Sequence, residues 1–308
     1  MRRLVAPLGI AALALIAAPA AQAGTFLPEG GSPGADSVRT LYIMVALLAL
    51  VIFLGVEGLL IYSMLKFRAR KGRVAAQIHG NTRLEIGWTV GAALILVFIT
   101  VFTFILLDDV KNPAASEIDA QGNPVATNAQ YASTDQPPPP AGSAPLNVHV
   151  DGLQYVWRFT YPAEQGETQV FSYQDMYVPI GRTVTLDITS DDVAHSWWIP
   201  QLGGKMDAVP GYENHFWFQV PLDALKEGES RLIYEGQCAE LCGRNHANMY
   251  ARVIALPADE WQRWYDEKRT QIKQAQQEAA DARKQLEQSQ GPAAEQGGAT
   301  GPSQGTED

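Results

Sequence analysis

Two long apolar stretches dominate the first third of the chain, at residues 41–65 and 86–107. As helices that rise 1.5 Å per residue they would reach about 37 and about 33 Å, enough to cross the roughly 30 Å hydrocarbon core of a bilayer. The segment that joins them is rich in Lys and Arg, whereas Asp108 and Asp109 follow the second stretch. Because positively charged loops stay in the cytoplasm, we predict a transmembrane helical hairpin over residues 41–107, followed by chain outside the cytoplasm.

The residues before the hairpin have the pattern of an export signal. Residues 1–23 include two arginines at the start, continue through a short apolar run and end in Ala21-Gln22-Ala23, the small-x-small pattern of a cleavage site. We therefore predict a cleaved signal peptide over residues 1–23 and a short extracytoplasmic segment over residues 24–40.

The hydropathy pattern changes after the second apolar stretch. Residues 108–146 are rich in Ala, Pro, Asn and Gln and contain four consecutive prolines, which predicts a stiff, extended linker that offers no core. Residues 147–257 instead alternate short runs of β-branched and aromatic side chains with turn residues, the pattern of a β-sandwich or barrel. The predicted strands are 147–150, 154–161, 169–178, 183–188, 215–220, 231–234 and 250–256.

The last two segments have no strand pattern. Residues 258–290 are helix formers with many Gln, Glu, Lys and Arg, and we predict one surface helix there. Residues 291–308 are rich in Gly, Pro and Ser, a composition that cannot bury enough apolar surface to fold, so we predict a disordered tail.

The net charge of the chain indicates which kinds of partner it can bind. Among its 308 residues, 33 are Asp or Glu and 23 are Lys or Arg, for a net charge of −10. This excess of negative charge disfavours nucleic acid, whose phosphates attract basic patches. Residues 147–257 carry 14 acidic and seven basic side chains. Their acidity favours a basic partner protein, although it would equally keep an exported domain soluble.

The candidate chemistry is concentrated in one short loop between the last two predicted strands. Cys238 and Cys242 are the only cysteines of the chain, and His246 and Met249 follow them in a C-x3-C-x3-H-x2-M pattern. Thiolate, imidazole and thioether ligands suit copper. Single-copper electron-transfer sites use one Cys, two His and a weak Met, so the second Cys favours two copper ions that share both thiolates. The alternative is a disulfide, which an oxidising compartment permits but which leaves the His and the Met unexplained.

A dinuclear centre of this kind needs a second histidine. His195 follows the predicted strand 183–188, where a loop at the end of the barrel would begin. We choose it because functional residues concentrate on loops. His149 and His215 lie within predicted strands and are interpreted as ordinary sheet residues, and His79 lies in the cytoplasmic loop.

Two acidic residues lie in or beside the predicted spans. Glu57 lies within the first span, where a carboxylate must be protonated, paired or turned toward another protein chain. Glu85 stands at the cytoplasmic end of the second span, near Arg83, where position alone favours an ordinary interfacial residue.

These features together resemble one known family. Two spans, an acidic β domain, an H-S-W-W-I-P segment that begins at His195 and a C-A-E-L-C-G-R-N-H-A-N-M segment that begins at Cys238 are similar to subunit II of the haem–copper cytochrome c oxidases. The resemblance covers residues 41–264 and implies a cupredoxin-like Greek-key barrel with a dinuclear copper centre, CuA. It implies these ligands: Cys238 and Cys242 as bridges, His195 and His246 as terminal ligands, Met249 on one copper and the backbone carbonyl of Glu240 on the other.

The resemblance also implies roles for residues around the centre. The Glu240 side chain would bind a magnesium ion shared with the catalytic subunit, Asp192 would lie on the docking face for cytochrome c, and Glu85 would stand at the mouth of a proton channel. Family members commonly have an aromatic run with Trp first and third, the first accepting electrons from the cytochrome. This chain has Tyr155 first and keeps Trp157 third, so the path by which electrons enter can differ.

The implied activity is that of an electron-relay subunit. It would accept electrons from a separate c-type cytochrome and pass them to haem in catalytic subunit I, which reduces oxygen to water and pumps protons. The chain has no C-x-x-C-H motif, so we predict no c-type haem of its own. One alternative is a relay subunit of another haem–copper reductase, such as a nitric oxide reductase. The other, a copper-free quinol oxidase subunit, is disfavoured by the complete ligand set. We expect a bacterial plasma membrane, with other oxidase subunits as partners.

Overall fold

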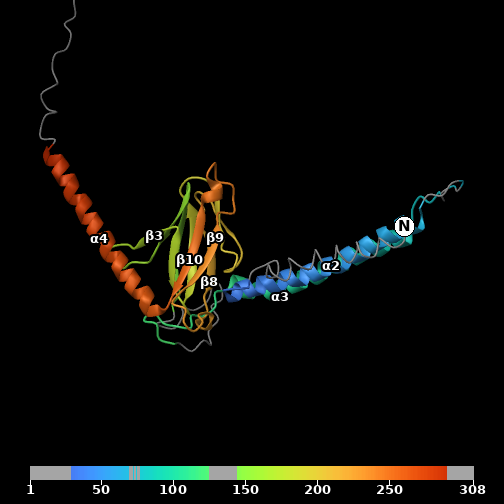
Figure 1. Ribbon diagram of the computed structural model, residues 1–308, viewed down its shortest axis with the longest axis horizontal. Helices are drawn as coiled ribbons and strands as arrows, with labels where there is room; N and C mark the ends of the chain where they lie inside the picture. The colour runs from blue at the N-terminus through green and yellow to red at the C-terminus, as the bar shows by residue number, and fades with distance from the viewer. Residues whose placement is uncertain (1–28, 69–71, 73, 75–76, 125–143, 290–308) are drawn as a thin grey trace, which may run out of the picture.

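The computed structural model describes residues 29–68, 72, 74, 77–124 and 144–289 of the chain. The predicted signal peptide at residues 1–23 and the predicted tail at residues 291–308 lie outside the described residues. The described chain forms a helical hairpin, a β domain and a long C-terminal helix, in that order (Figure 1).

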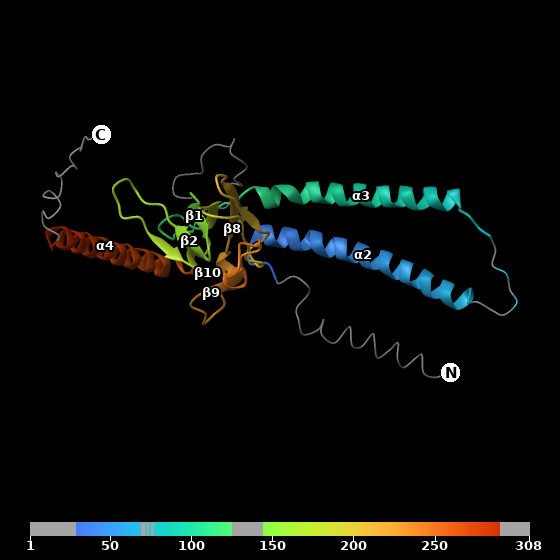
Figure 2. The ribbon, with the colours of Figure 1, turned by 90° about the horizontal axis from the view of Figure 1, so that it is seen from above.

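The hairpin consists of α2 (Pro33–Lys66) and α3 (Thr82–Lys111), which run antiparallel and lie closest together near the β domain (Figure 2). Both helices are long and apolar enough to cross a membrane. Each begins before its predicted position, so the predicted segment 24–40 is partly helical. The prediction followed apolar residues alone, whereas the helices extend into polar end residues. Pro33 and Asp36 suit a first helical turn.

The β domain contains ten strands within the described residues, in three sheets. Their bounds are β1 (Leu146–Leu153), β2 (Val156–Thr160), β3 (Phe171–Tyr173), β4 (Asp175–Pro179), β5 (Thr183–Ser190), β6 (His195–Trp197), β7 (Met206–Ala208), β8 (Asn214–Gln219), β9 (Leu232–Gln237) and β10 (Tyr250–Leu256). The sheet orders are β3-β2-β1-β5-β8, β4-β10-β9 and β6-β7. β1 is parallel to β5 and β10 is parallel to β4, while the other pairs are antiparallel. A helical hairpin followed by a cupredoxin-like β domain and a C-terminal helix confirms the predicted fold class.

Two details of the strands differ from the sequence prediction. The predicted strand 169–178 is divided into β3 and β4, because Gln174 adopts a φ of 64° and the chain passes from the first sheet to the second. The short strands β6 and β7 were not predicted at all. Since β6 begins at His195, this residue belongs to a strand rather than to the predicted loop.

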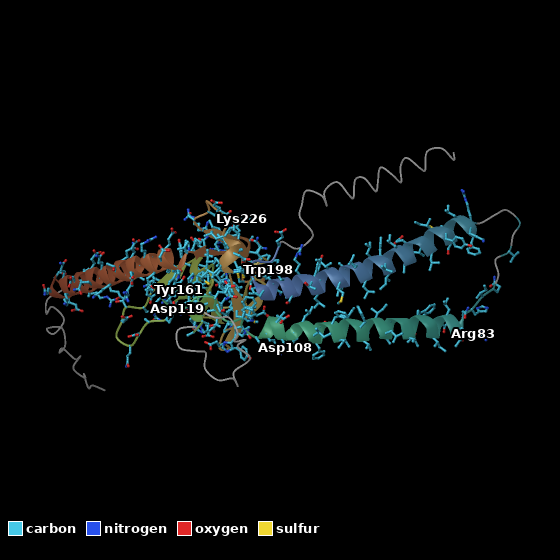
Figure 3. The ribbon with its side chains drawn as sticks, turned by 90° about the horizontal axis from the view of Figure 1, so that it is seen from below. Arg83, Asp108, Asp119, Tyr161, Trp198 and Lys226 are labelled. Carbon is cyan, nitrogen blue, oxygen red and sulfur yellow. The ribbon has the colours of Figure 1, made fainter. Side chains whose placement is uncertain are left out.

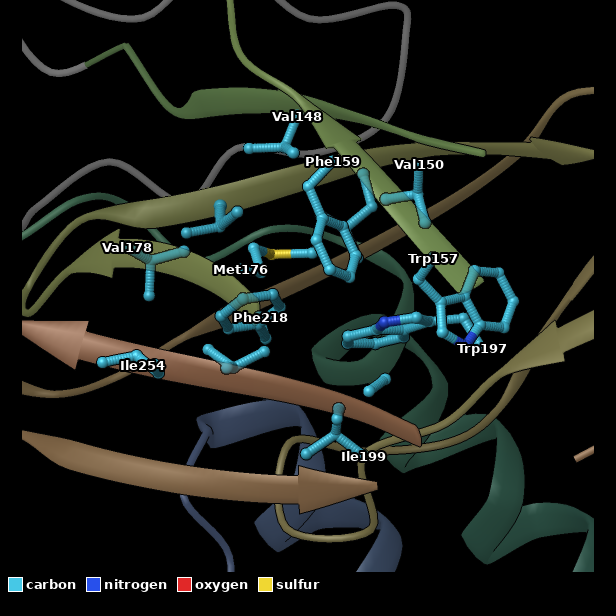
Figure 4. Packing of buried hydrophobic residues seen from close by; sticks show 14 of the residues in the cluster. Val148, Val150, Trp157, Phe159, Met176, Val178, Trp197, Ile199, Phe218 and Ile254 are labelled. Carbon is cyan, nitrogen blue, oxygen red and sulfur yellow. The ribbon is translucent and has the colours of Figure 1, made fainter. Parts of the chain in front are cut away.

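The core lies between the two larger sheets (Figure 4). Along β1, Val148 and Val150 are buried, whereas Asn147 is exposed and His149 is half-buried. This alternation specifies the register, because a shift by one residue would turn the polar side chains into the core. The largest buried side chains include Trp157, Phe159, Met176, Trp197 and Phe218.

Part of the predicted linker packs against the β domain. Ser116 and Ile118 are buried, and Thr183 N donates a hydrogen bond to Ser116 Oγ at 3.1 Å. The prediction of a linker without core contacts is therefore wrong for residues 112–124. The chain crosses the base of the barrel here, and its backbone and side-chain groups find partners at the start of β5. Residues 125–143 lie outside the described residues.

The C-terminal helix, α4 (Ala258–Ser289), is attached to the domain by its first turns. Trp261 Nε1 donates a hydrogen bond to the Tyr177 carbonyl at 3.0 Å, and the Trp264 ring stacks on the Tyr177 ring with centroids 4.3 Å apart. The rest of α4 projects away from the sheets (Figures 1 and 2). Aromatic residues therefore anchor the start of the helix, its contacts with the domain continue to the buried Ile272, and the residues beyond Ile272 are exposed.

Candidate metal centre

One loop, between β9 and β10, carries four of the predicted ligand residues: Cys238, Cys242, His246 and Met249. The two strands are antiparallel neighbours, and Cys238 N donates a hydrogen bond to Met249 O at 2.9 Å. This hydrogen bond closes the loop at its base. Side chains from both ends of the loop are therefore held next to each other.

A second segment brings His195 to this loop. His195 is the first residue of β6 and is fully buried. Two backbone hydrogen bonds join its segment to the β9–β10 connection: Ala239 N donates to Ser196 O at 2.8 Å, and Gln237 N donates to Trp198 O at 3.0 Å. The position of His195 thus depends on contacts between residues that are far apart in sequence.

Cys238 lies at the centre of the first group of donor atoms. Its Sγ is 3.8 Å from His195 Nδ1 and 3.2 Å from the backbone oxygen of Glu240. The thiol therefore faces one imidazole and one carbonyl, both within the reach of a shared ion. Both Cys238 and His195 are buried.

Cys242 lies at the centre of a second, similar group. Its Sγ is 3.5 Å from His246 Nδ1 and 3.8 Å from Met249 Sδ. The Cys238 and Cys242 sulfur atoms are 3.9 Å apart, far beyond the roughly 2.0 Å of a disulfide bond, and both thiols are free. The arrangement is thus two sulfur atoms side by side, each with its own imidazole and one weaker donor.

The two thiols have opposite acid–base tendencies. Burial acts to raise the pKa of Cys238, but hydrogen bonds with His195 and Ser196 outweigh it and lower this pKa to about 6. Burial and the negative charge of Cys238 raise the pKa of Cys242 to about 11. The negative charge on the Cys238 sulfur therefore disfavours ionisation of Cys242. A cation bound to both sulfur atoms would relieve this repulsion.

Asp192 holds the side of the His195 ring that faces away from the thiol. Its carboxylate accepts hydrogen bonds from His195 Nε2 at 2.8 Å, from Val193 N at 2.6 Å and from Gln154 N at 2.6 Å. Burial acts to raise the pKa of Asp192, but these hydrogen bonds outweigh it and lower the pKa. Because Nε2 faces Asp192, Nδ1 is the ring nitrogen that faces Cys238, and loss of the Nδ1 proton would give it the lone pair that a metal ligand needs.

The two aromatic residues proposed for electron transfer occupy different environments. Trp157 is fully buried in the core (Figure 4). Its ring lies edge-on to the His195 ring, with centroids 5.8 Å apart. Tyr155 is half-buried at the loop, where a Cβ on Gly243 would lie 2.7 Å from its hydroxyl oxygen. Trp157 therefore cannot touch a docked protein directly, whereas Tyr155 borders the loop.

Sequence reasoning missed three exposed apolar side chains that are close in sequence to the candidate ligands. Leu241 is 76% exposed, and Val193 and Tyr250 are also exposed. An apolar residue between Glu240 and Cys242 in an otherwise polar loop was the available signal. Such residues suit contact with another protein rather than with solvent.

Comparison with known proteins identifies the family of the chain. Residues 147–256 match the family described as cytochrome c oxidase subunit II, periplasmic domain, and residues 20–106 match its transmembrane domain. Cytochrome c oxidase subunit 2 of Synechocystis sp. is 32% identical over 265 residues, which cover 77% of this chain and 74% of that protein. The chain belongs to the cytochrome c oxidase subunit II family.

Other relatives differ in how much of their length is matched. Cytochrome c oxidase subunit 2 of Alkalihalophilus pseudofirmus is 34% identical over 233 residues, which cover 75% of this chain. The chain spans 57% of that relative and 49% of the one from Bacillus sp., or about half of each. The solved periplasmic domain of subunit II of cytochrome oxidase from Bradyrhizobium japonicum is 25% identical, covers 41% of this chain and 95% of its own, and has a TM-score of 0.36.

This member of the family is a two-span membrane protein with an extracytoplasmic β domain. Arg83 and Asp108 lie at opposite ends of α3, with Asp108 next to the β domain (Figure 3). The basic end of the hairpin is thus the end remote from the β domain, as the positive-inside rule requires.

Glu85 has a structural contact at the start of α3. Its Oε1 accepts a hydrogen bond from Asn81 N at 3.2 Å, while Asn81 Oδ1 accepts one from Leu84 N at 3.2 Å. The two side chains cap the helix reciprocally, in the manner of a capping box. The role of Glu85 at a proton channel stays a prediction. Glu57 is exposed on α2, where another protein chain can reach it.

The backbone oxygen and the side chain of Glu240 lie in different environments. Its backbone oxygen faces Cys238, whereas the residue as a whole is exposed. The side chain is therefore accessible to a neighbouring subunit. The magnesium site assigned to it stays a prediction.

Proposed function

We propose that this chain is the electron-accepting subunit of an aerobic respiratory haem–copper oxidase. It takes electrons from a c-type cytochrome at a dinuclear copper centre and passes them to haem in catalytic subunit I, which reduces oxygen to water and pumps protons. One observation carries the proposal: two free thiols lie 3.9 Å apart, each with a separate imidazole and one weaker donor.

The donor set fits a copper pair. Cys238 and Cys242 would bridge the ions, and each ion would have its own imidazole, from His195 or His246. Met249 would bind one ion and the Glu240 carbonyl the other. Soft sulfur with imidazole nitrogen is the combination that copper prefers, and hard cations would select oxygen instead. When bound, a copper pair supplies a one-electron couple whose charge is shared between two metals.

The protein contributes a rigid and largely dry enclosure. Cys238, Cys242, His195 and Met249 are all buried, so little water reaches the donor atoms. The closed base of the loop and the backbone hydrogen bonds to the β6 segment hold the donors in place. A site that hardly moves when its charge changes requires little reorganisation, which favours fast transfer at small driving force.

The surface around the loop supports a basic redox partner. Asp191, Asp192 and Glu240 are exposed, and so is the apolar side chain of Leu241; all of them belong to the two segments that build the centre. Acidic groups steer a basic cytochrome toward this face, and an apolar side chain allows close contact after docking. Because Trp157 is buried behind His195, we place the first electron contact at the loop and at Tyr155.

The remaining roles concern the partner subunits. The Glu240 side chain would bind magnesium together with subunit I, and Glu85 would stand at the mouth of a proton channel in that subunit. Oxygen chemistry belongs to the haem-bearing partner, and this chain acts as a non-catalytic relay in the bacterial plasma membrane.

Copper loading of the full chain in detergent tests the proposal. The loaded protein should be purple and should show the electron spin signal of one electron shared by two coppers. Cys238→Ser should lose this paired signal, whereas Arg244→Gln, an exposed residue of the same loop, should keep it. A single-copper spectrum, or no copper uptake by the unaltered chain, would reject the proposal.

A further inference from the structure

A group of histidine and carboxylate side chains lies on the outer face of the five-stranded sheet. β1, β5 and β8 are neighbours in this sheet, with His149 opposite Asp187 and Asp187 opposite His215. Val148 and Val150, on either side of His149, are buried in the core. Because side chains alternate along a strand, the three residues form one row on the outer face.

Three donor groups in and beside this row, from Asp187, Glu213 and His215, are close enough to share one ion. His215 Nδ1 lies 2.8 Å from Asp187 Oδ1, and donor atoms of Asp187, Glu213 and His215 all lie within 4.8 Å of one another. His149 Nδ1 lies 3.8 Å from Glu213 Oε2. One imidazole and two carboxylates from neighbouring strands therefore converge on one place, and His149 approaches this group through Glu213.

A buried carboxylate orients one of the imidazoles. His149 Nε2 lies 3.1 Å from Asp151 Oδ1, and the Asp151 side chain is only 10% exposed. This contact leaves His149 Nδ1 to face Glu213. Histidines that bind metals usually donate their other ring N–H to a carboxylate in this way, which fixes the tautomer and the ring orientation.

The charge of the group favours a cation. Within the part of the chain that the structure describes, the ion-pair partners of Asp151, Asp187 and Glu213 are imidazoles and not Lys or Arg. A neutral imidazole leaves the charge of a carboxylate uncompensated, so the negative potential remains. Imidazole nitrogen with carboxylate oxygen is a donor set of Zn²⁺ and related divalent ions, unlike the sulfur-rich loop.

We infer that His149, Asp187, Glu213 and His215 bind one divalent metal ion of the zinc class on the outer face of the sheet. The ion would join β1, β5 and the start of β8 through their side chains. Because it binds the folded arrangement only, it would also stabilise the domain by mass action. The inference is independent of the copper centre, since none of these residues belongs to it.

Zinc binding to the full chain in detergent tests this inference. All proteins would carry Cys238→Ser and Cys242→Ser, so that the loop thiols cannot capture zinc. Equilibrium dialysis against zinc chloride, with metal content measured by mass spectrometry, gives the stoichiometry and the dissociation constant. The test variants are His149→Gln combined with His215→Gln, and separately Glu213→Gln. The matched control is Glu227→Gln, another exposed glutamate of the same domain.

We expect one zinc ion per chain in the parent protein and in the control. Each test variant should raise the dissociation constant at least about ten-fold, the lower end of the effect of altering even an outer partner of a metal ligand. Zinc should raise the unfolding temperature of the parent more than that of the test variants. The absence of saturable zinc binding by the parent, or equal binding by parent, control and test variants, would overturn the inference.

Discussion

The carboxylate of Asp192 is bonded through both oxygens, so the effect of Asp192→Asn can be worked out from the structure. Oδ1 accepts hydrogen bonds from His195 Nε2 and Val193 N, and Oδ2 accepts one from Gln154 N. An asparagine has one oxygen and one NH2 group in these places. Whichever way the amide turns, its NH2 group faces an N–H donor, and His195 loses a charged partner.

The expected loss of copper affinity in Asp192→Asn follows from the strength of the hydrogen bond between His195 and the charged carboxylate. A hydrogen bond to a charged group contributes about 1.5 to 3 kcal/mol, and the 31% exposure of the Asp192 side chain favours the lower value. Since about 1.4 kcal/mol corresponds to a factor of ten, we expect copper affinity to fall about ten-fold. This lies at the lower end of the effects typical of carboxylates that orient metal-binding histidines.

Competition with a copper chelator measures this change on the full chain in detergent. Asp191→Asn is the matched control, because it removes the same charge from the neighbouring exposed residue. Reaction rates with a c-type cytochrome should be measured in parallel for both variants. If both retain copper like the unaltered chain and both slow the cytochrome reaction equally, Asp192 acts only on the docking face and the reasoning above is wrong.

Three further changes probe the centre and the segments that support it. Met249→Leu should keep both metals but shift the reduction potential, because it removes only a weak ligand; an unchanged potential in electrochemical titration would contradict thioether ligation. Tyr155→Trp should change the rate of electron acceptance from the cytochrome in stopped-flow mixing and leave the copper absorption unaltered, whereas an equal rate would move the first contact elsewhere. Gly236→Ala should lower the unfolding free energy by about 1 to 3 kcal/mol, because a Cβ there meets the Trp198 carbonyl. Thermal unfolding checks this, and an unchanged midpoint would show that β9 is not packed tightly against the β6 segment.

Local patterns of apolar and polar residues in the sequence were sufficient to predict much of the fold. Two apolar stretches predicted the two spans, because a helix in a bilayer must present apolar side chains on all sides over a known length. The strand 250–256 was predicted with the bounds of β10, since a short apolar run bounded by polar and turn residues is typical of a buried strand. The division at Gln174 and the strand β6 escaped prediction, because a single backbone angle and a three-residue strand leave no periodic signal.

The C-x3-C-x3-H-x2-M loop is likewise a property of the sequence alone, because four donor side chains within one short segment lie near each other in any fold. The tertiary structure, in contrast, determines which histidine from outside the loop joins these donors. His195 lies 43 residues before Cys238, and the pairing of β6 and the contact of Asp192 set its ring against the thiol. The row of His149, Asp187 and His215 also depends on three strands meeting in register. Contacts between residues so far apart in sequence depend on how the whole domain packs. A local sequence pattern therefore cannot predict them.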